Sequence, residues 1–121
     1  GGEQTRIFLS IQIVAAKTTQ LPSLILDEAD VGVGGTTADT IGRLLLDLGA
    51  NTQVICITHA PQVAAIGQSH MRVVKEDSEA TIENLDYDMR VEELARMLAG
   101  SGITEKTRDY ANTLLKEASR K

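Results

Sequence analysis

"LILDEAD", residues 24–30, sets three aliphatic side chains directly against the carboxylates of Asp27 and Glu28. The continuous apolar run from Leu24 to Leu26 is typical of a strand that is covered on both faces of a parallel sheet. Asp27 and Glu28 follow at the carboxyl end of that strand, where open α/β sheets bind their ligands. This stretch therefore predicts a buried strand that ends at a polar site.

The residues after this strand predict a βαβ unit. "DVGVGG", residues 30–35, is typical of a turn, and apolar residues then recur at helical spacing until Gly49 stops the helix. "TQVICIT", residues 52–58, predicts the next buried strand, directly before His59. Strands joined in this way are parallel, so we expect Glu28 and His59 at the same edge of the sheet.

The rest of the chain predicts two further strands and three further helices. A mostly buried helix is expected from residue 5 to about 17, ending before Pro22. An edge hairpin is expected from "MRVVKE" (71–76) and "ATIENLDY" (80–87) around the turn "EDSE". A helix should run from near Asp88 to Gly100, and Thr104 should cap the last helix.

Composition indicates one small α/β domain. The 121 residues are 42% hydrophobic but only 2% aromatic, so Leu, Ile, Val and Ala must build the core. A net charge of -5 argues against a broad contact surface for nucleic acid. Cys56 has no partner for a disulfide, which fits a cytosolic protein, and we interpret it as a small buried side chain. His70 is interpreted as a solvated turn residue, and no zinc-ligand spacing is present.

The acidic pair and His59 suggest phosphoryl transfer. One carboxylate beside a divalent cation and a second beside an attacking water are what that reaction requires. The phosphate-binding sequence G-x-x-x-x-G-K-[ST] does not occur in the chain. We therefore expect half of an active site, which by itself binds ATP weakly or not at all.

Several families share parts of this pattern. "DEAD", residues 27–30, resembles the second motif of DEAD-box helicases, but those carry serine-alanine-threonine on the next strand where this chain has "THA". "GVGGTT", residues 32–37, lacks the third glycine of a dinucleotide-binding loop. "GGE" (1–3), "LILDEAD", "VGVGG" (31–35) and "THAPQVAA" (58–65) together resemble the C-terminal lobe of an ABC-type ATPase head.

Within that superfamily the sequences of these motifs are similar to those of the RecN family of SMC-like proteins, which act in bacterial DNA double-strand break repair and recombination. "DEADVGVGG" (27–35), "THAPQVAAIGQSH" (58–70) and the tail over residues 95–118 carry the resemblance through essentially the whole chain. It implies that residues 1–121 are the C-terminal lobe of an ATPase head. The chain would then begin inside the signature motif, as a fragment of a larger ATPase whose Walker A lobe lies elsewhere.

The resemblance also implies roles for individual residues. Asp27, in the Walker B motif, would support Mg²⁺ through water, Glu28 would be the general base, and His59 would be the switch histidine at the γ-phosphate of ATP. Gly1, Gly2 and Glu3 would end the signature motif, which binds the nucleotide of the opposite head.

The implied partners are the Walker A lobe, a second head in a homodimer, and DNA through the parent protein rather than mainly this lobe. Gly34 stands where transporters and condensins carry an aspartate that reaches across the head dimer. No membrane partner is implied, and the implied location is the bacterial cytoplasm, in association with the nucleoid. The matching half of an ABC transporter ATPase, a DEAD-box-like helicase fragment and a non-catalytic interaction module stay open as alternatives.

Overall fold

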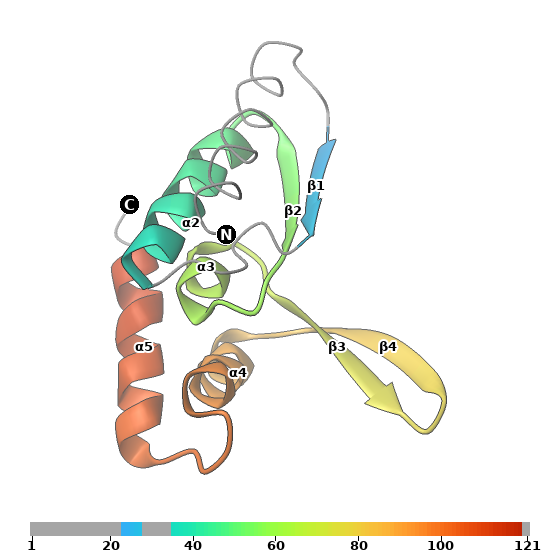
Figure 1. Cartoon of the computed structure of the whole chain (residues 1–121), viewed down its shortest axis with the longest axis vertical. Helices are drawn as coiled ribbons and strands as arrows, with labels where there is room; N and C mark the ends of the chain where they lie inside the picture. Colours follow the sequence, from blue (N-terminus) through green and yellow to red (C-terminus); the bar gives the residue numbers. More distant parts are fainter. Residues whose placement is uncertain (1–22, 28–34, 120–121) are drawn as a thin grey trace. The chain divides into compact units, whose positions relative to one another are not determined.

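A parallel strand pair with two helices and a hairpin with two further helices make up the described part of the chain (Figure 1). The computed structural model describes residues 23–27 and 35–119, and the predicted helix over residues 5–17 lies outside them. The chain divides into two compact units, Gly1–Ile66 and Gly67–Lys121.

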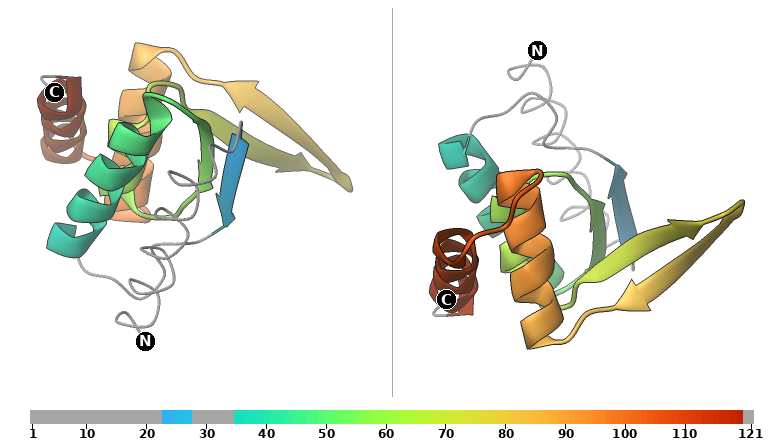
Figure 2. Two further views of the ribbon diagram at one scale, coloured as in Figure 1. Left: turned by 90° about the horizontal axis from the view of Figure 1, so that it is seen from above. Right: turned by 90° about the horizontal axis from the view of Figure 1, so that it is seen from below.

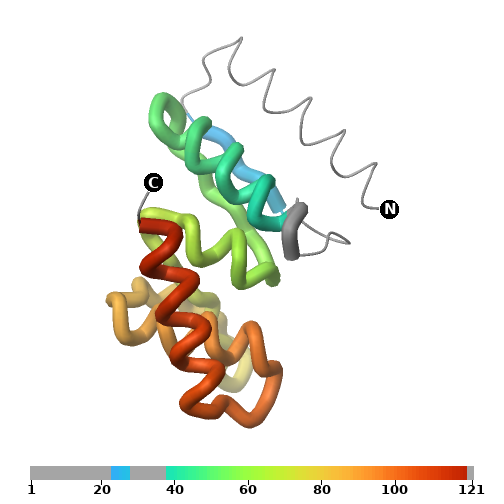
Figure 3. The backbone as a smooth tube through the Cα atoms, turned by 90° about the vertical axis from the view of Figure 1, so that its left-hand side faces the viewer, coloured from blue at the N-terminus to red at the C-terminus, as the bar shows by residue number. Residues whose placement is uncertain are grey.

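The first unit contains the predicted βαβ arrangement. Strand β1 pairs in parallel with β2, in a register that runs from Ser23 opposite Gln53 to Asp27 opposite Ile57. The helix between them packs along the strand pair, as Figure 3 shows, and contacts a short helix that follows β2. The parallel pairing predicted from the sequence is confirmed. The elements of this unit are β1 (Ser23–Asp27), α2 (Gly35–Gly49), β2 (Gln53–Ile57) and α3 (Pro61–Ile66).

The core of this unit lies on one face of the strand pair. Leu24, Val54 and Cys56 pack against the buried cluster, so Cys56 lies on the covered face as a half-buried side chain. Ile25 and Ile57 point the other way and are 64% and 49% exposed. The prediction that both faces are covered was therefore wrong for these strands, because α2 packs on one face and side chains alternate along a strand. The buried cluster consists of Leu26, Ala38, Ile41, Leu45, Leu48 and Val63.

Helices α2 and α3 approach closely at Gly42, which is buried. A Cβ atom on Gly42 would lie 2.6 Å from Cδ1 of Ile66 and 3.5 Å from Cα of Val63. The Ile66 methyl group is the end of a flexible side chain and can rotate away from one added carbon. A larger side chain would push on the α3 backbone itself.

We expect Gly42→Val to lower the free energy of unfolding by about 1–3 kcal/mol, because overpacking forces α3 away from α2. Urea unfolding followed by circular dichroism measures this. Ile66→Val, which deletes the crowded Cδ1 atom, should recover part of the loss in the double variant. Gly49→Val is the matched control, since a Cβ there meets none of the described atoms within 4 Å. An equal loss in the control would contradict the explanation.

The second unit begins with the predicted hairpin. Strands β3 and β4 pair antiparallel from Met71 opposite Asn84 to Glu76 opposite Glu79, and Asp77 in the turn has a φ of 54°. Among the described residues the hairpin forms a two-stranded sheet of its own, whereas we expected it at the edge of one larger sheet. The two helices after it lie side by side (Figure 2). This unit contains β3 (Met71–Glu76), β4 (Glu79–Asn84), α4 (Tyr87–Ala99) and α5 (Glu105–Ser119).

Capping side chains set the ends of the two helices. Asp86 accepts a 2.9 Å hydrogen bond from the Met89 backbone N–H, so α4 begins at Tyr87. The strand that we predicted to reach Tyr87 therefore ends earlier, at Asn84. Gly100, with a φ of 71°, ends α4 as predicted. Thr104 accepts from the Thr107 N–H at 3.3 Å, which confirms the predicted cap of α5.

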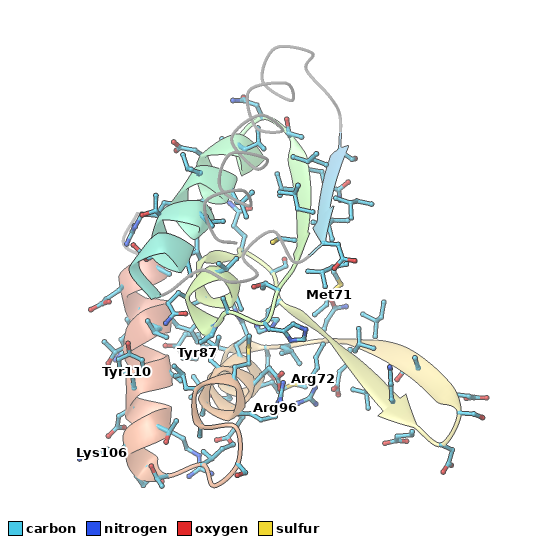
Figure 4. The ribbon with its side chains drawn as sticks, viewed as in Figure 1. Met71, Arg72, Tyr87, Arg96, Lys106 and Tyr110 are labelled. Carbon is cyan, nitrogen blue, oxygen red and sulfur yellow. The ribbon has the colours of Figure 1, made fainter. Side chains whose placement is uncertain are left out.

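A buried carboxylate ties α4 to the hairpin. Glu93 is only 4% exposed, and its oxygens bind Arg72 of β3 at 3.2 Å and Arg96 of α4 at 2.5 Å. Arg72 also binds Glu83 of β4 at 2.5 Å, and Figure 4 shows Arg72 and Arg96 next to each other. Burial by itself raises the pKa of Glu93, but hydrogen bonds from Arg96 and Arg72 hold that pKa below its ordinary value.

His70 is half-buried, so its interpretation as a solvated turn residue was wrong. Its carbonyl oxygen accepts from the Leu85 N–H at 3.0 Å, which holds it beside β4. Its Nδ1 atom is buried and meets no hydrogen-bond partner among the described residues. Burial, followed by the charge of Arg90, lowers the pKa of His70 below its ordinary value of 6.5, although Glu93 acts in the opposite direction.

We expect the free energy of unfolding to fall as the pH drops below 6.5, the ordinary pKa of His70. In that window the unfolded chain binds a proton that the folded state disfavours, so stability rises with pH. Urea unfolding across this range should show a positive slope that His70→Gln reduces. An unchanged slope in His70→Gln would contradict the assignment.

Candidate functional site

Two strand ends form the centre of the candidate site. Asp27 closes β1 and pairs in register with Ile57, the last residue of β2, so the segment Thr58–His59 leaves the sheet beside Asp27. The side chains of Asp27 and His59 are both exposed. The structure therefore confirms that the Asp27 and His59 ends of the two strands share one edge of the sheet.

The segment that carries His59 is a tight turn. The Thr58 hydroxyl accepts a 2.9 Å hydrogen bond from the Ala60 N–H. The Ala60 carbonyl accepts from the N–H groups of Val63 at 3.1 Å and Ala64 at 3.0 Å, which begins α3. His59 thus lies between a strand end and a helix start. Helix α3 was not predicted from the sequence, although Pro61 at its first position is a typical helix-start signal.

Several predicted site residues lie outside the described residues. They are Glu28, the proposed base, Gly34 in the following loop, and Gly1, Gly2 and Glu3 of the signature segment. Their roles stay predictions from the sequence.

Asp27 has the chemistry expected of a carboxylate that supports Mg²⁺. Mg²⁺ keeps several waters and takes one or two carboxylates together with substrate phosphates, so it does not need a cage of protein ligands. No cluster of three or more His, Cys, Asp or Glu that could hold a metal ion occurs among the described residues. Asp27 is exposed at the strand end, and its contact with Mg²⁺ through water stays a prediction from the sequence.

In the part of the chain that the structure describes, none of the helices combines the length and apolar character needed to cross a membrane.

Comparison with curated proteins gives close relatives along nearly all of the chain. The chain is 47% identical over 119 residues to the DNA repair protein RecN of Vibrio cholerae, a match that covers 95% of this chain and 22% of that protein. It is 44% identical over 123 residues to RecN of Mycobacterium leprae, covering 100% of this chain and 21% of that protein. The predicted resemblance to RecN is confirmed. The chain spans about a fifth of the length of the RecN proteins it matches.

A comparison of folds agrees with the RecN match. A structure solved in work on ATP-driven dimerisation and DNA-stimulated activation of SMC ATPases matches with a TM-score of 0.74, covering 84% of this chain and 63% of that chain. At 19% identity this likeness concerns the fold alone: the chain has the predicted α/β arrangement, and that arrangement is similar to the fold of the SMC ATPase structure. A scan against models of protein families gave no match.

Proposed function

We propose that this chain is the C-terminal lobe of the ATPase head of a RecN-like DNA repair protein, and that it supplies residues for ATP hydrolysis. The observation that carries the proposal is the register of β1 and β2, which brings the Asp27 end of one strand beside the His59 end of the other. Similarity to RecN over nearly the whole chain and the SMC-type fold support it.

We assign a distinct task to each of three residues, Asp27, Glu28 and His59. Bound Mg²⁺ offsets the charge of the phosphates of ATP during phosphoryl transfer. Asp27 orients water toward that ion. Glu28 accepts a proton from the attacking water, and His59 contacts the γ-phosphate, so that charge which develops there meets a hydrogen-bond donor.

The proposal includes partners that complete the site. An N-terminal lobe of the same protein supplies the Walker A phosphate cradle, which this sequence lacks. A second head faces this one in a homodimer, with Gly1–Glu3 and Gly34 near the shared nucleotide. DNA is bound mainly by other parts of the parent protein, because the net charge of -5 does not favour phosphate contacts. We place the protein in the cytoplasm, with the nucleoid.

Asp27→Asn and His59→Ala, each made in the full-length protein, test the proposal. Asp27→Asn should weaken magnesium-dependent ATP binding and also slow turnover, because it weakens support of the ion. His59→Ala should slow turnover by about 100-fold through loss of one contact to the developing charge. Equilibrium nucleotide titration and steady-state phosphate release measure the two effects.

Asp39→Asn is the matched control for these variants. Asp39 lies on α2 and binds Arg43 at 2.9 Å in an exposed pair, so its replacement should change neither affinity nor turnover. Normal hydrolysis in both Asp27→Asn and His59→Ala would rule out the proposed site.

A further inference from the structure

A side-chain hydrogen bond spans the turn around His59, from the Ala60 N–H to the Thr58 hydroxyl at 2.9 Å. We propose that Thr58 is a positioning residue for His59: its hydroxyl fixes the backbone turn that presents the imidazole at the end of β2. The inference rests on the proposed role of His59 and adds a residue to it.

The residue before this turn is fixed by the sheet. Ile57 pairs with Asp27 in the parallel register, so the backbone that enters the turn is aligned with the end of β1. Thr58 is therefore the first residue after the pairing between the described parts of the two strands. Any freedom at Thr58 or His59 changes where the imidazole lies relative to Asp27.

The residue after the turn is fixed by α3 and the core. The Ala60 carbonyl accepts from the N–H groups of Val63 and Ala64, and the Val63 side chain is 5% exposed within the core of the first unit. Ile66, at the other end of α3, packs against α2 at Gly42. The helix thus holds Ala60 in place from its far side.

The Thr58 hydroxyl joins these two fixed points across His59. A hydroxyl that accepts from the N–H two residues ahead is a local turn motif of Ser and Thr. Valine has nearly the same shape as threonine but cannot accept the hydrogen bond, so the half-buried Ala60 N–H would lose this partner. Serine keeps the oxygen. Comparing Thr58→Val with Thr58→Ser therefore separates the effect of the hydroxyl from the effect of side-chain shape.

Steady-state ATP hydrolysis by the full-length protein tests the inference. Thr58→Val should lower kcat by about threefold to tenfold, the loss expected when one hydrogen bond no longer holds the geometry. KM for ATP should change little, and Thr58→Ser should restore kcat. Thr81→Val, an exposed threonine of β4, is the control and should leave kcat unchanged.

The same variants in a His59→Ala background distinguish positioning from a general structural role. A residue that acts only through His59 has no further effect once the imidazole is gone, so Thr58→Val should then leave kcat unchanged. Thermal unfolding of each variant checks that the fold is retained. Thr58→Ala removes the same hydroxyl and replaces Thr58→Val if the valine variant does not fold.

Two results would overturn the inference while leaving the proposed function intact. In the first, His59→Ala slows hydrolysis but Thr58→Val does not. In the second, Thr58→Val lowers kcat by the same factor with and without His59, which would show that Thr58 does not act through His59. If His59→Ala itself hydrolyses ATP normally, the role proposed for His59 fails, and the role of Thr58 fails with it.

Discussion

Replacing Glu28 by Gln in the full-length protein should lower ATP turnover about 100- to 10,000-fold while nucleotide affinity stays nearly normal. Glutamine keeps the shape and hydrogen-bonding reach of glutamate, so the attacking water can still be held. It has no carboxylate to accept the proton, so general-base assistance is lost. Single-turnover hydrolysis and equilibrium ATP titration separate the two quantities.

Glu76→Gln provides the matched control for Glu28→Gln. Glu76 is an exposed residue at the end of β3, beside the hairpin turn, so its replacement should leave turnover unchanged. In the presence of ATP, the two heads of the Glu28→Gln variant should remain bound to each other, because hydrolysis no longer releases them. Hydrolysis at the unmodified rate would show that Glu28 is not the base. The proposed catalytic reason for the pair Asp27 and Glu28 after the apolar run would then fail.

The double replacement of Arg72 and Arg96 by Met should lower the free energy of unfolding by about 3–5 kcal/mol at neutral pH. Both arginines bind Glu93, whose side chain is 5% exposed. Removing them leaves a buried carboxylate without its cations. This lowers stability more than replacing Glu93 and both arginines together by apolar residues would. Urea unfolding at constant pH measures the loss.

The pH dependence of that loss identifies its cause. In the unmodified chain, burial raises the pKa of Glu93 but the hydrogen bonds of Arg96 and Arg72 lower it below the ordinary value of 4.5. Glu93 therefore contributes stability above pH 4.5 that is lost as the pH falls through its folded pKa. In the double variant burial alone acts and raises the pKa, so protonation in acid relieves the destabilisation. The difference between the two proteins should shrink at low pH.

Arg108→Met is the control for the arginine replacements. Arg108 binds Glu92 and Glu105 at the surface of α4 and α5, where solvent screens the pairs, so its loss should leave stability nearly unchanged. A pH-independent loss in the double variant would show that the arginines contribute packing alone, and that the charge of Glu93 is not what they stabilise.

The sequence by itself determined the local elements of this protein and their order. Alternation of apolar runs with helical periodicity predicted the βαβ unit. The parallel direction of its strands predicted one edge for Glu28 and His59, and the structure shows that the strands end together at Asp27 and Ile57. Local chemistry also determined several ends: Gly100 and Thr104 act as caps where we expected them. The caps depend on neighbouring residues in the chain, and the pairing of the two strands follows from the general geometry of a βαβ unit, which is why a pattern can predict both.

Only the tertiary structure decided what each element packs against. The apolar run of β1 predicted burial on both faces, yet α2 covers one face and Ile25 lies on the other, 64% exposed. The burial of Glu93 was not predicted, because it depends on the hairpin, whose Arg72 lies 21 positions away from Glu93 in the sequence. The Thr58 hydrogen bond is local, but tertiary contacts fix the backbone on both sides of it: β2 is paired to β1, and α3 packs against α2 at Gly42. The βαβ pattern predicted that β1 and β2 pair, but the burial of each side chain and the ion pairs between distant residues depend on which surfaces meet, and the local pattern did not predict those.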